Sequence, residues 1–266
     1  MPLPTSSTPA RGRSRLSVRL ARDAADLAAV QRLRWRVFQE EMGAAIAAPS
    51  IGLDVDAYDP LCDHLLVIDE ERDESDAVVG TYRLLRESVA RQAGGFYSSG
   101  EFDLSPLIAA REEAEAGQLL ELGRSCVLLP YRTSATINLL WRGIADYIAS
   151  HSIRLMFGCA SFPGIDPNLF APALSYLHHH HLAPADQRPR VLDGKGVCMD
   201  RLARGSYDER RALLQLPPLI KGYMRVGAKF GEGAYIDHVF NTVDVCVVMP
   251  VEQIADRYAA RFSVAA

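Results

Sequence analysis

The sequence lacks the patterns that define several common protein classes. Its 266 residues include only five cysteines, widely spaced and without a C-x-x-C pair, so no zinc ribbon or dithiol redox motif is present. No apolar run reaches the ~18 residues of a membrane span. Neither a G-x-G-x-x-G loop nor a Walker A loop occurs. These absences argue against disulfide-stapled, membrane-spanning, dehydrogenase and P-loop proteins, and they favour a cytoplasmic location.

The chain also lacks a large net charge, because 29 Lys+Arg residues face 33 Asp+Glu residues. A balance near −4 argues against a nucleic-acid-binding protein. The charge is nevertheless segregated: residues 1–38 carry eight arginines and two acidic residues, whereas residues 39–124 carry nineteen acidic and six basic residues. The basic beginning predicts a disordered tail over residues 1–16, followed by one folded domain over residues 17–262.

Hydrophobic periodicity predicts an α/β fold, with a mixed β-sheet flanked by helices. Strands are expected at residues 16–20, 64–69, 77–85, 119–129, 153–159, 223–228 and 243–249. Helices are expected at residues 23–42, 134–150, 168–182 and 251–262. Because a helix separates the strand at 119–129 from the strand at 153–159, we expect these two strands to pair in parallel.

Several stretches of sequence occur in the order found in a known family. They are GTYRLL at 80–85, GFYSSGEFDL at 95–104, ELGRSCV at 121–127, FGCASFPGIDP at 157–167 and LPPLIKGYMRVGA at 216–228. With the element order, they resemble the bacterial ornithine N-acyltransferases over roughly residues 17–262. The resemblance implies a GNAT-like α/β fold, in which two central parallel strands splay apart.

The same resemblance implies an activity. The enzyme would move a 3-hydroxyacyl group from acyl carrier protein to the α-amino group of L-ornithine. The product would be lyso-ornithine lipid, formed in the first step of ornithine lipid biosynthesis. No bound cofactor is implied, since 3-hydroxyacyl-(acyl carrier protein) is a co-substrate. The expected partners are therefore acyl carrier protein and ornithine.

A more distant similarity to the acyl-homoserine-lactone synthases indicates which residues form the site. Their sparse signature fits seven positions here, in the same order along the chain. The similarity places catalytic roles on Glu121, Arg124 and Asp59. It places substrate binding on Arg34, Phe38, Asp56 and Arg83.

The chemistry of amide formation agrees with these residue types. An amine must be neutral when it attacks a thioester, so a carboxylate such as Glu121 is needed to accept its proton. Ornithine is a net cation, which favours carboxylates such as Asp56 and Asp59 around it. Each assignment has a structural alternative: Glu121 could form an ion pair with Arg124, and the aspartates could belong to a turn.

The stretch PYRTSATI at 130–137 lies where GNAT enzymes that use acetyl-CoA carry a glycine-containing loop for the pyrophosphate. Here Ala135 and Ile137 replace the glycines. This departure argues against CoA and for pantetheine on a carrier protein, which bears a single phosphate. We expect Arg132, Thr133 and Ser134 to bind it, and Thr133 or Ser134 can also cap the following helix.

Other interpretations remain open at this stage. The four histidines His178–His181 do not predict a metal site, because adjacent helical side chains point in different directions. One alternative function is an acyl-homoserine-lactone-like synthase that uses S-adenosylmethionine. Another is a non-catalytic GNAT relative that binds lipid or carrier protein. The basic tail also suggests peripheral contact with the inner-membrane surface.

Overall fold

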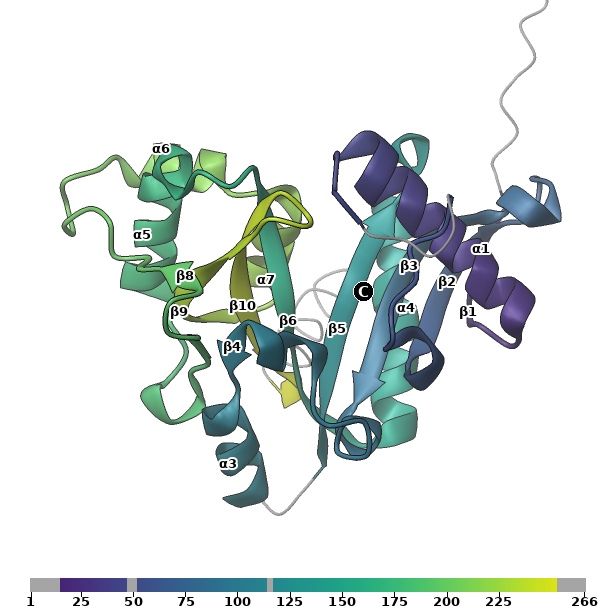
Figure 1. The fold of residues 1–266 in the computed structure, drawn as a ribbon, viewed down its shortest axis with the longest axis horizontal. Helices are drawn as coiled ribbons and strands as arrows, with labels where there is room; N and C mark the ends of the chain where they lie inside the picture. The colour runs from purple at the N-terminus through teal and green to yellow at the C-terminus, as the bar shows by residue number, and fades with distance from the viewer. Residues whose placement is uncertain (1–14, 47–51, 114–116, 253–266) are drawn as a thin grey trace, which may run out of the picture.

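The computed structural model describes residues 15–46, 52–113 and 117–252. In these ranges the strands form a ten-stranded sheet in the order β1-β2-β3-β5-β6-β10-β9-β7-β4, with β8 paired to β9 (Figure 1). The predicted tail at 1–16 and the predicted helix at 251–262 lie almost entirely outside the described residues. None of the helices described here has the length and apolar composition needed to cross a membrane.

The sheet and its helices have the following bounds. The strands are β1 (Leu16–Leu20), β2 (Asp63–Asp69), β3 (Val78–Arg86), β4 (Phe102–Asp103), β5 (Gln118–Val127), β6 (Ile153–Pro163), β7 (Arg190–Val191), β8 (Gly196–Val197), β9 (Lys229–Asp237) and β10 (Thr242–Pro250). The helices are α1 (Ala24–Arg34), α2 (Glu87–Ala90), α3 (Ser105–Glu113), α4 (Ser134–His151), α5 (Ala171–His181), α6 (Glu209–Gln215) and α7 (Pro218–Arg225).

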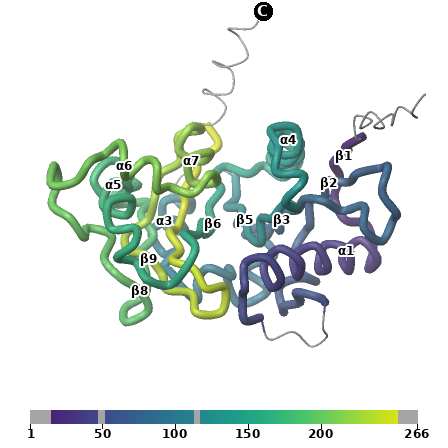
Figure 2. The backbone as a smooth tube through the Cα atoms, turned by 90° about the horizontal axis from the view of Figure 1, so that it is seen from above, coloured from purple at the N-terminus to yellow at the C-terminus, as the bar shows by residue number. Residues whose placement is uncertain are grey.

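Helices cover both faces of the sheet, as Figure 2 shows for α4 and α1 on opposite sides. The apolar stripe of α4 includes Leu140 and Ile144, and it packs on one face together with α5 and α7. On the other face, α1 packs Val30 and Leu33 against β2, β3 and β5. The rest of that face is covered by the segment 87–113, which contains α2 and α3.

The centre of the sheet opens between β5 and β6. These strands pair in parallel, as predicted, but only at four positions, from Gln118–Ile153 to Glu121–Phe157. Beyond this point β5 remains paired with β3, and β6 remains paired with β10. The two strands therefore diverge toward their carboxyl ends, as Figure 1 shows, and this confirms the predicted splay.

A glycine stands where the divergence begins. A Cβ atom on Gly158 would lie 2.1 Å from the carbonyl oxygen of Leu122 on the neighbouring strand. That distance is far below van der Waals contact, so a larger residue would push the two strands apart. Gly158 thus allows the strands to stay in close contact up to the point where they diverge.

Gly158→Ala should therefore destabilise the protein by about 1–3 kcal/mol, because the backbone of β6 must move. Gly222→Ala is the matched control, since a Cβ atom there meets nothing within 4 Å. In the interior of a helix this control should be neutral or stabilising by about 0.5–1 kcal/mol. Urea unfolding measures both variants, and equal stabilities would contradict the proposed close approach.

Most of the predicted elements are confirmed, with one error and one change of helix type. The predicted strand at 223–228 is wrong, because Tyr223 belongs to α7 and the strand β9 begins at Lys229. The predicted helix at 23–42 is α-helical up to Arg34 and continues as a π-helix over Trp35–Glu41. Helices α2, α3, α6 and α7 and strands β4, β7, β8 and β9 were not predicted.

Candidate active site

Glu121 is the last residue of β5 that pairs with β6, so its side chain lies at the beginning of the opening. Its carboxylate accepts hydrogen bonds from the backbone N–H groups of Tyr97 at 2.8 Å and Ser98 at 2.7 Å, and from the Ser98 hydroxyl. Burial raises the pKa of Glu121, and the bonds from Ser98 and Tyr97 oppose that rise. The site thus contains a buried, oriented carboxylate.

A second group of charged residues lies beside it, and we call it the aspartate–arginine network. Arg34, at the end of α1, is fully buried and donates to both carboxylate oxygens of Asp59 at 2.8 and 2.9 Å. Its Nε donates to Asp54 at 2.8 Å. Burial alone would raise the pKa of Asp59, but Arg34 and Gln31 lower it to about 2.

The network includes two more arginines, nearer the opening. Arg83 donates to Asp56 at 2.5 Å and to Asp59 at 3.2 Å. Arg124 donates to Asp56 at 3.0 Å and forms an ion pair with Asp54 at 3.3 Å. Three arginines therefore face three aspartates, and the network is close to neutral as a unit.

The backbone around Arg124 departs from regular strand geometry. Its φ is +48°, and the β3–β5 register shifts between Thr81 and Arg83. Such a bulge redirects a side chain and twists the strand. The guanidinium carbon of Arg124 lies 4.9 Å from the ring centre of Tyr97 and 4.4 Å from that of Phe240.

The structure brings together all seven residues that the lactone-synthase similarity singled out. Phe38 joins the group through Phe240, whose ring centre is 5.5 Å away and which also contacts Arg124. Tyr97 contacts Arg83, Arg124 and Glu121, and it connects the network with the buried carboxylate. These seven residues are Arg34, Phe38, Asp56, Asp59, Arg83, Glu121 and Arg124.

The three residues expected to bind pantetheine lie elsewhere, between the carboxyl end of β5 and the first turn of α4. Thr133 caps α4, since its hydroxyl accepts from the backbone N–H of Thr136 at 3.4 Å. Ser134 is the first residue of the helix. Arg132 donates to the carbonyl of Val127 at 3.0 Å and pairs with Glu41 at 2.6 Å. The capping alternative is thus confirmed for Thr133.

The sequence analysis missed two further acidic residues, Glu101 and Asp244. The pKa of Glu101 is raised to about 7, mainly by burial and also by the charges of Asp244, Asp237 and Glu121, against a hydrogen bond from the Cys159 thiol at 3.1 Å. Burial also raises the pKa of Asp244 to about 6. The available signal was a lone acid in the apolar run VDVCVV of the last strand.

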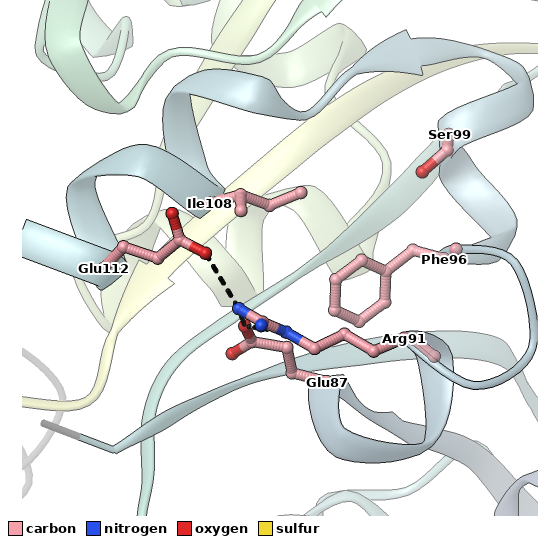
Figure 3. Close-up of a pocket in the computed structure, with 8 residues that line it drawn as sticks. Glu87, Arg91, Phe96, Ser99, Ile108 and Glu112 are labelled. Carbon is pink, nitrogen blue, oxygen red and sulfur yellow. Dashed lines mark hydrogen bonds and ion pairs between the residues drawn. The ribbon is translucent and has the colours of Figure 1, made fainter.

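A pocket of about 240 Å³ lies beside the segment 95–99, whose backbone donates hydrogen bonds to Glu121. Figure 3 shows it between α2 and α3, with Phe96 and Ile108 on its wall. Arg91 crosses its rim and pairs with Glu87 at 2.8 Å and with Glu112 at 2.9 Å. Phe96 also packs on Phe157 of β6, the residue paired with Glu121, so the pocket is adjacent to the candidate site.

Known proteins resemble this chain in sequence and in fold. The acetyltransferase (GNAT) domain family matches residues 33–142. A protein of Agrobacterium fabrum (strain C58), named L-ornithine N(α)-acyltransferase, is 48% identical over 251 residues, which cover 93% of this chain and 85% of the relative.

Solved structures share the fold at low sequence identity. FeeM, an N-acyl amino acid synthase from uncultured soil microbes, has a TM-score of 0.56 at 10% identity, covering 94% of this chain and 99% of that chain. The acyl-homoserine-lactone synthase LasI has a TM-score of 0.47 at 13% identity, covering 90% and 91% of the two chains. The GNAT match and the FeeM fold confirm the predicted fold class.

Proposed function

The chain belongs to the L-ornithine N(α)-acyltransferase family, and from this premise we propose that it transfers a 3-hydroxyacyl group from acyl carrier protein to the α-amino group of L-ornithine. It is an acyltransferase. The product of the proposed reaction is a lyso-ornithine lipid. The observation that carries the proposal is the buried, oriented carboxylate of Glu121 at the opening between β5 and β6.

Glu121 accepts the proton that the α-ammonium group must lose before it attacks. The free amine then adds to the thioester carbonyl carbon, the carbon–sulfur bond breaks, and the pantetheine thiolate leaves, taking up the second proton that the nitrogen loses as the amide forms. Burial raises the pKa of Glu121 toward that of the α-ammonium group, and this makes the carboxylate a stronger base. The hydrogen bonds from Tyr97 and Ser98 hold it in position.

The donor arm lies in the opening between β5 and β6. Backbone groups of β5 beyond Glu121 have no pairing partner on β6 in the described chain, so they are available to the arm. A backbone N–H there would stabilise the negative charge that develops on the thioester oxygen. The first turn of α4, with Thr133, Ser134 and Arg132, lies at the open end and suits a phosphate group.

The aspartate–arginine network positions the acceptor. Arg124 is the most exposed arginine of the network, at 11%. We propose that it binds the α-carboxylate group of ornithine. Asp59 acts indirectly, because it is 1% exposed and holds Arg34 and Arg83. Asp56 links Arg83 to Arg124. Phe38 supports Phe240, against which the Arg124 guanidinium packs.

An assay that resolves products by mass tests this function. Purified protein receives 3-hydroxyacyl carrier protein and ornithine, lysine or S-adenosylmethionine as separate acceptors. The expected product is N-acylornithine. An acylated lactone from S-adenosylmethionine would instead support the lactone-synthase alternative, and transfer to no amine would support the non-catalytic one.

Acyl-CoA of the same chain length should be a poorer donor than acyl carrier protein. The loop at 130–137 has Ala135 and Ile137 in place of the glycines that would let backbone groups enclose a pyrophosphate. Losing one or two such hydrogen bonds corresponds to a kcat/KM lower by about 10- to 100-fold. Equal kcat/KM values for the two donors would show that this loop does not select the carrier.

A further inference from the structure

The aspartate–arginine network leaves one part of ornithine without a partner. Each of its three aspartates is already paired with arginine, so it offers little attraction to a second cation. The α-amino and α-carboxylate groups have partners in Glu121 and Arg124 under the proposed function, on which this inference rests. The side-chain ammonium group requires carboxylates that are not already in direct contact with an arginine.

Glu101 and Asp244 are carboxylates of this kind, and we call them the acidic pair. Neither is in direct ion-pair contact with a basic side chain in residues 15–46, 52–113 or 117–252, although the more distant charge of Arg124 lowers the pKa of Asp244. Glu101 is 7% exposed and Asp244 is 5% exposed. Burying two carboxylates near one another without a cation is unfavourable, so the pair is poised to bind one.

Asp244 provides an observation that is independent of the charge. Its Oδ1 atom is enclosed by protein and has no hydrogen bond of good geometry among the described residues, although the nearby Ser161 and Thr242 hydroxyls lower the pKa of this carboxyl. Asp244 lies on β10 opposite Tyr235 of β9 and Ser161 of β6, on the face that also carries Cys159 and Cys246. A buried acceptor without a donor is rare in native proteins and indicates a missing ligand group.

The acidic pair is connected to Glu121 by short contacts. The Cys159 thiol donates to Glu101 at 3.1 Å and lies 3.5 Å from the Ser98 hydroxyl. That hydroxyl donates to Glu121. Ser98 and Cys159 therefore lie between the Glu121 and Glu101 carboxylates, so the acidic pair is close to the residue that receives the α-ammonium proton.

We propose that Glu101 and Asp244 form the subsite for the side-chain ammonium group of the acceptor, and that this subsite selects a basic amino acid. Asp237 lies nearby, and it raises the pKa of both residues. Its own Oδ1 accepts from the backbone N–H groups of Val239 and Phe240, so its role is structural. The raised pKa values of the acidic pair are consistent with a site completed by a cation.

The test compares ornithine with norvaline, which has the same carbon chain but no side-chain ammonium group. Glu101→Gln and Asp244→Asn remove charge without changing shape, and the amide oxygen introduced by Glu101→Gln can still accept from the Cys159 thiol. In each variant the ornithine-to-norvaline ratio of kcat/KM should fall by about 10- to 100-fold. The kcat/KM for norvaline should change less than about 3-fold in each variant. The control Glu232→Gln, on β9 and outside the pair, should leave kcat/KM unchanged for both ornithine and norvaline.

Thermal unfolding without donor gives a readout that does not depend on turnover. At pH 8 Glu101→Gln should unfold at a higher temperature than wild type, because an uncompensated buried charge is gone. Ornithine should raise the unfolding temperature of wild type more than norvaline does, and this difference should vanish in both variants. Unchanged specificity ratios or an unchanged ornithine shift would overturn the subsite. Failure of wild type to acylate ornithine would overturn the proposed function instead, and the thermal shift would still decide the subsite.

Discussion

Glu121→Gln should lower kcat for acyl transfer to ornithine by about 10²- to 10⁴-fold, the usual contribution of a positioned general base. Glutamine keeps the length of the side chain and one acceptor oxygen, which can accept from Ser98 or from Tyr97 but not from both, because these N–H groups bind different oxygens of Glu121. It cannot take a proton from the α-ammonium group at neutral pH. The loss should therefore appear in kcat, with a smaller change in KM for ornithine.

Two further variants separate catalysis from structure. Ser98→Ala removes the hydroxyl that donates to Glu121 but keeps the backbone donor, so an intermediate loss of kcat is expected. Glu112→Gln removes a carboxylate of α3 whose side chain is 55% exposed, and kcat should not change. If Glu121→Gln retained kcat within about 3-fold, the proton would have another acceptor, such as water.

Arg34→Met should destabilise the protein by about 3–5 kcal/mol, the largest stability effect that we expect from a single substitution here. Arg34 is fully buried and provides two hydrogen bonds to Asp59 and one to the Asp54 carboxylate. Without it, two aspartates that are each 1% exposed lose their principal counter-charge. Urea unfolding at pH 7 measures the loss.

The same helical region provides the matched control. Arg36 pairs with Asp76 at 2.7 Å, but both side chains are 39% exposed, so Arg36→Met should cost less than about 1 kcal/mol. Comparable losses of unfolding free energy in the two variants would mean that the burial of the Arg34 ion pairs does not add to the stability of the protein. The comparison also distinguishes charge burial from the loss of a long side chain.

The loss of stability caused by Arg34→Met should depend on pH. In wild type the pKa of Asp59 is lowered to about 2, so its contribution to stability is present above the ordinary value of 3.8 and disappears as pH falls through about 2. Without Arg34 the buried Asp59 should have a raised pKa. The deficit of Arg34→Met should therefore narrow as pH falls from 7, because protonated Asp59 needs no counter-charge.

The fold could be predicted where the pattern is local. The apolar spacing of α4 and the nearly continuous apolar run of β10 are visible without tertiary information. Strand β9 was missed because it contains Gly231 and Gly233, where a Cβ atom would lie 2.7 Å from the Pro189 carbonyl and 2.3 Å from Val191. Close packing by a distant segment required those glycines, and they weakened the strand signal.

The clustering of the candidate site residues could be predicted from the sequence, but the charge balance among them could not. Seven residues were located because their spacing resembles that of a known family, and they do converge. The sequence could not show that Arg34, Arg83 and Arg124 neutralise the nearby aspartates, since that depends on the packing of α1 against the sheet. Glu101 and Asp244 are 143 positions apart, and only the pairing of β10 beside β6 brings Asp244 to the same side as Cys159.

The short β5–β6 ladder also determines how a molecule with a long tail can enter and leave. The ladder has four paired positions, and both strands run on from it without rejoining by backbone pairing in the described chain. The opening is therefore closed by backbone pairing at one end only. A long chain can enter it sideways from the open end, whereas an opening closed on all sides would admit the chain only end first. Under the proposed function, a carrier protein too large to enter inserts its arm and withdraws it, and the tail of the product follows the same route without breaking any strand pairing.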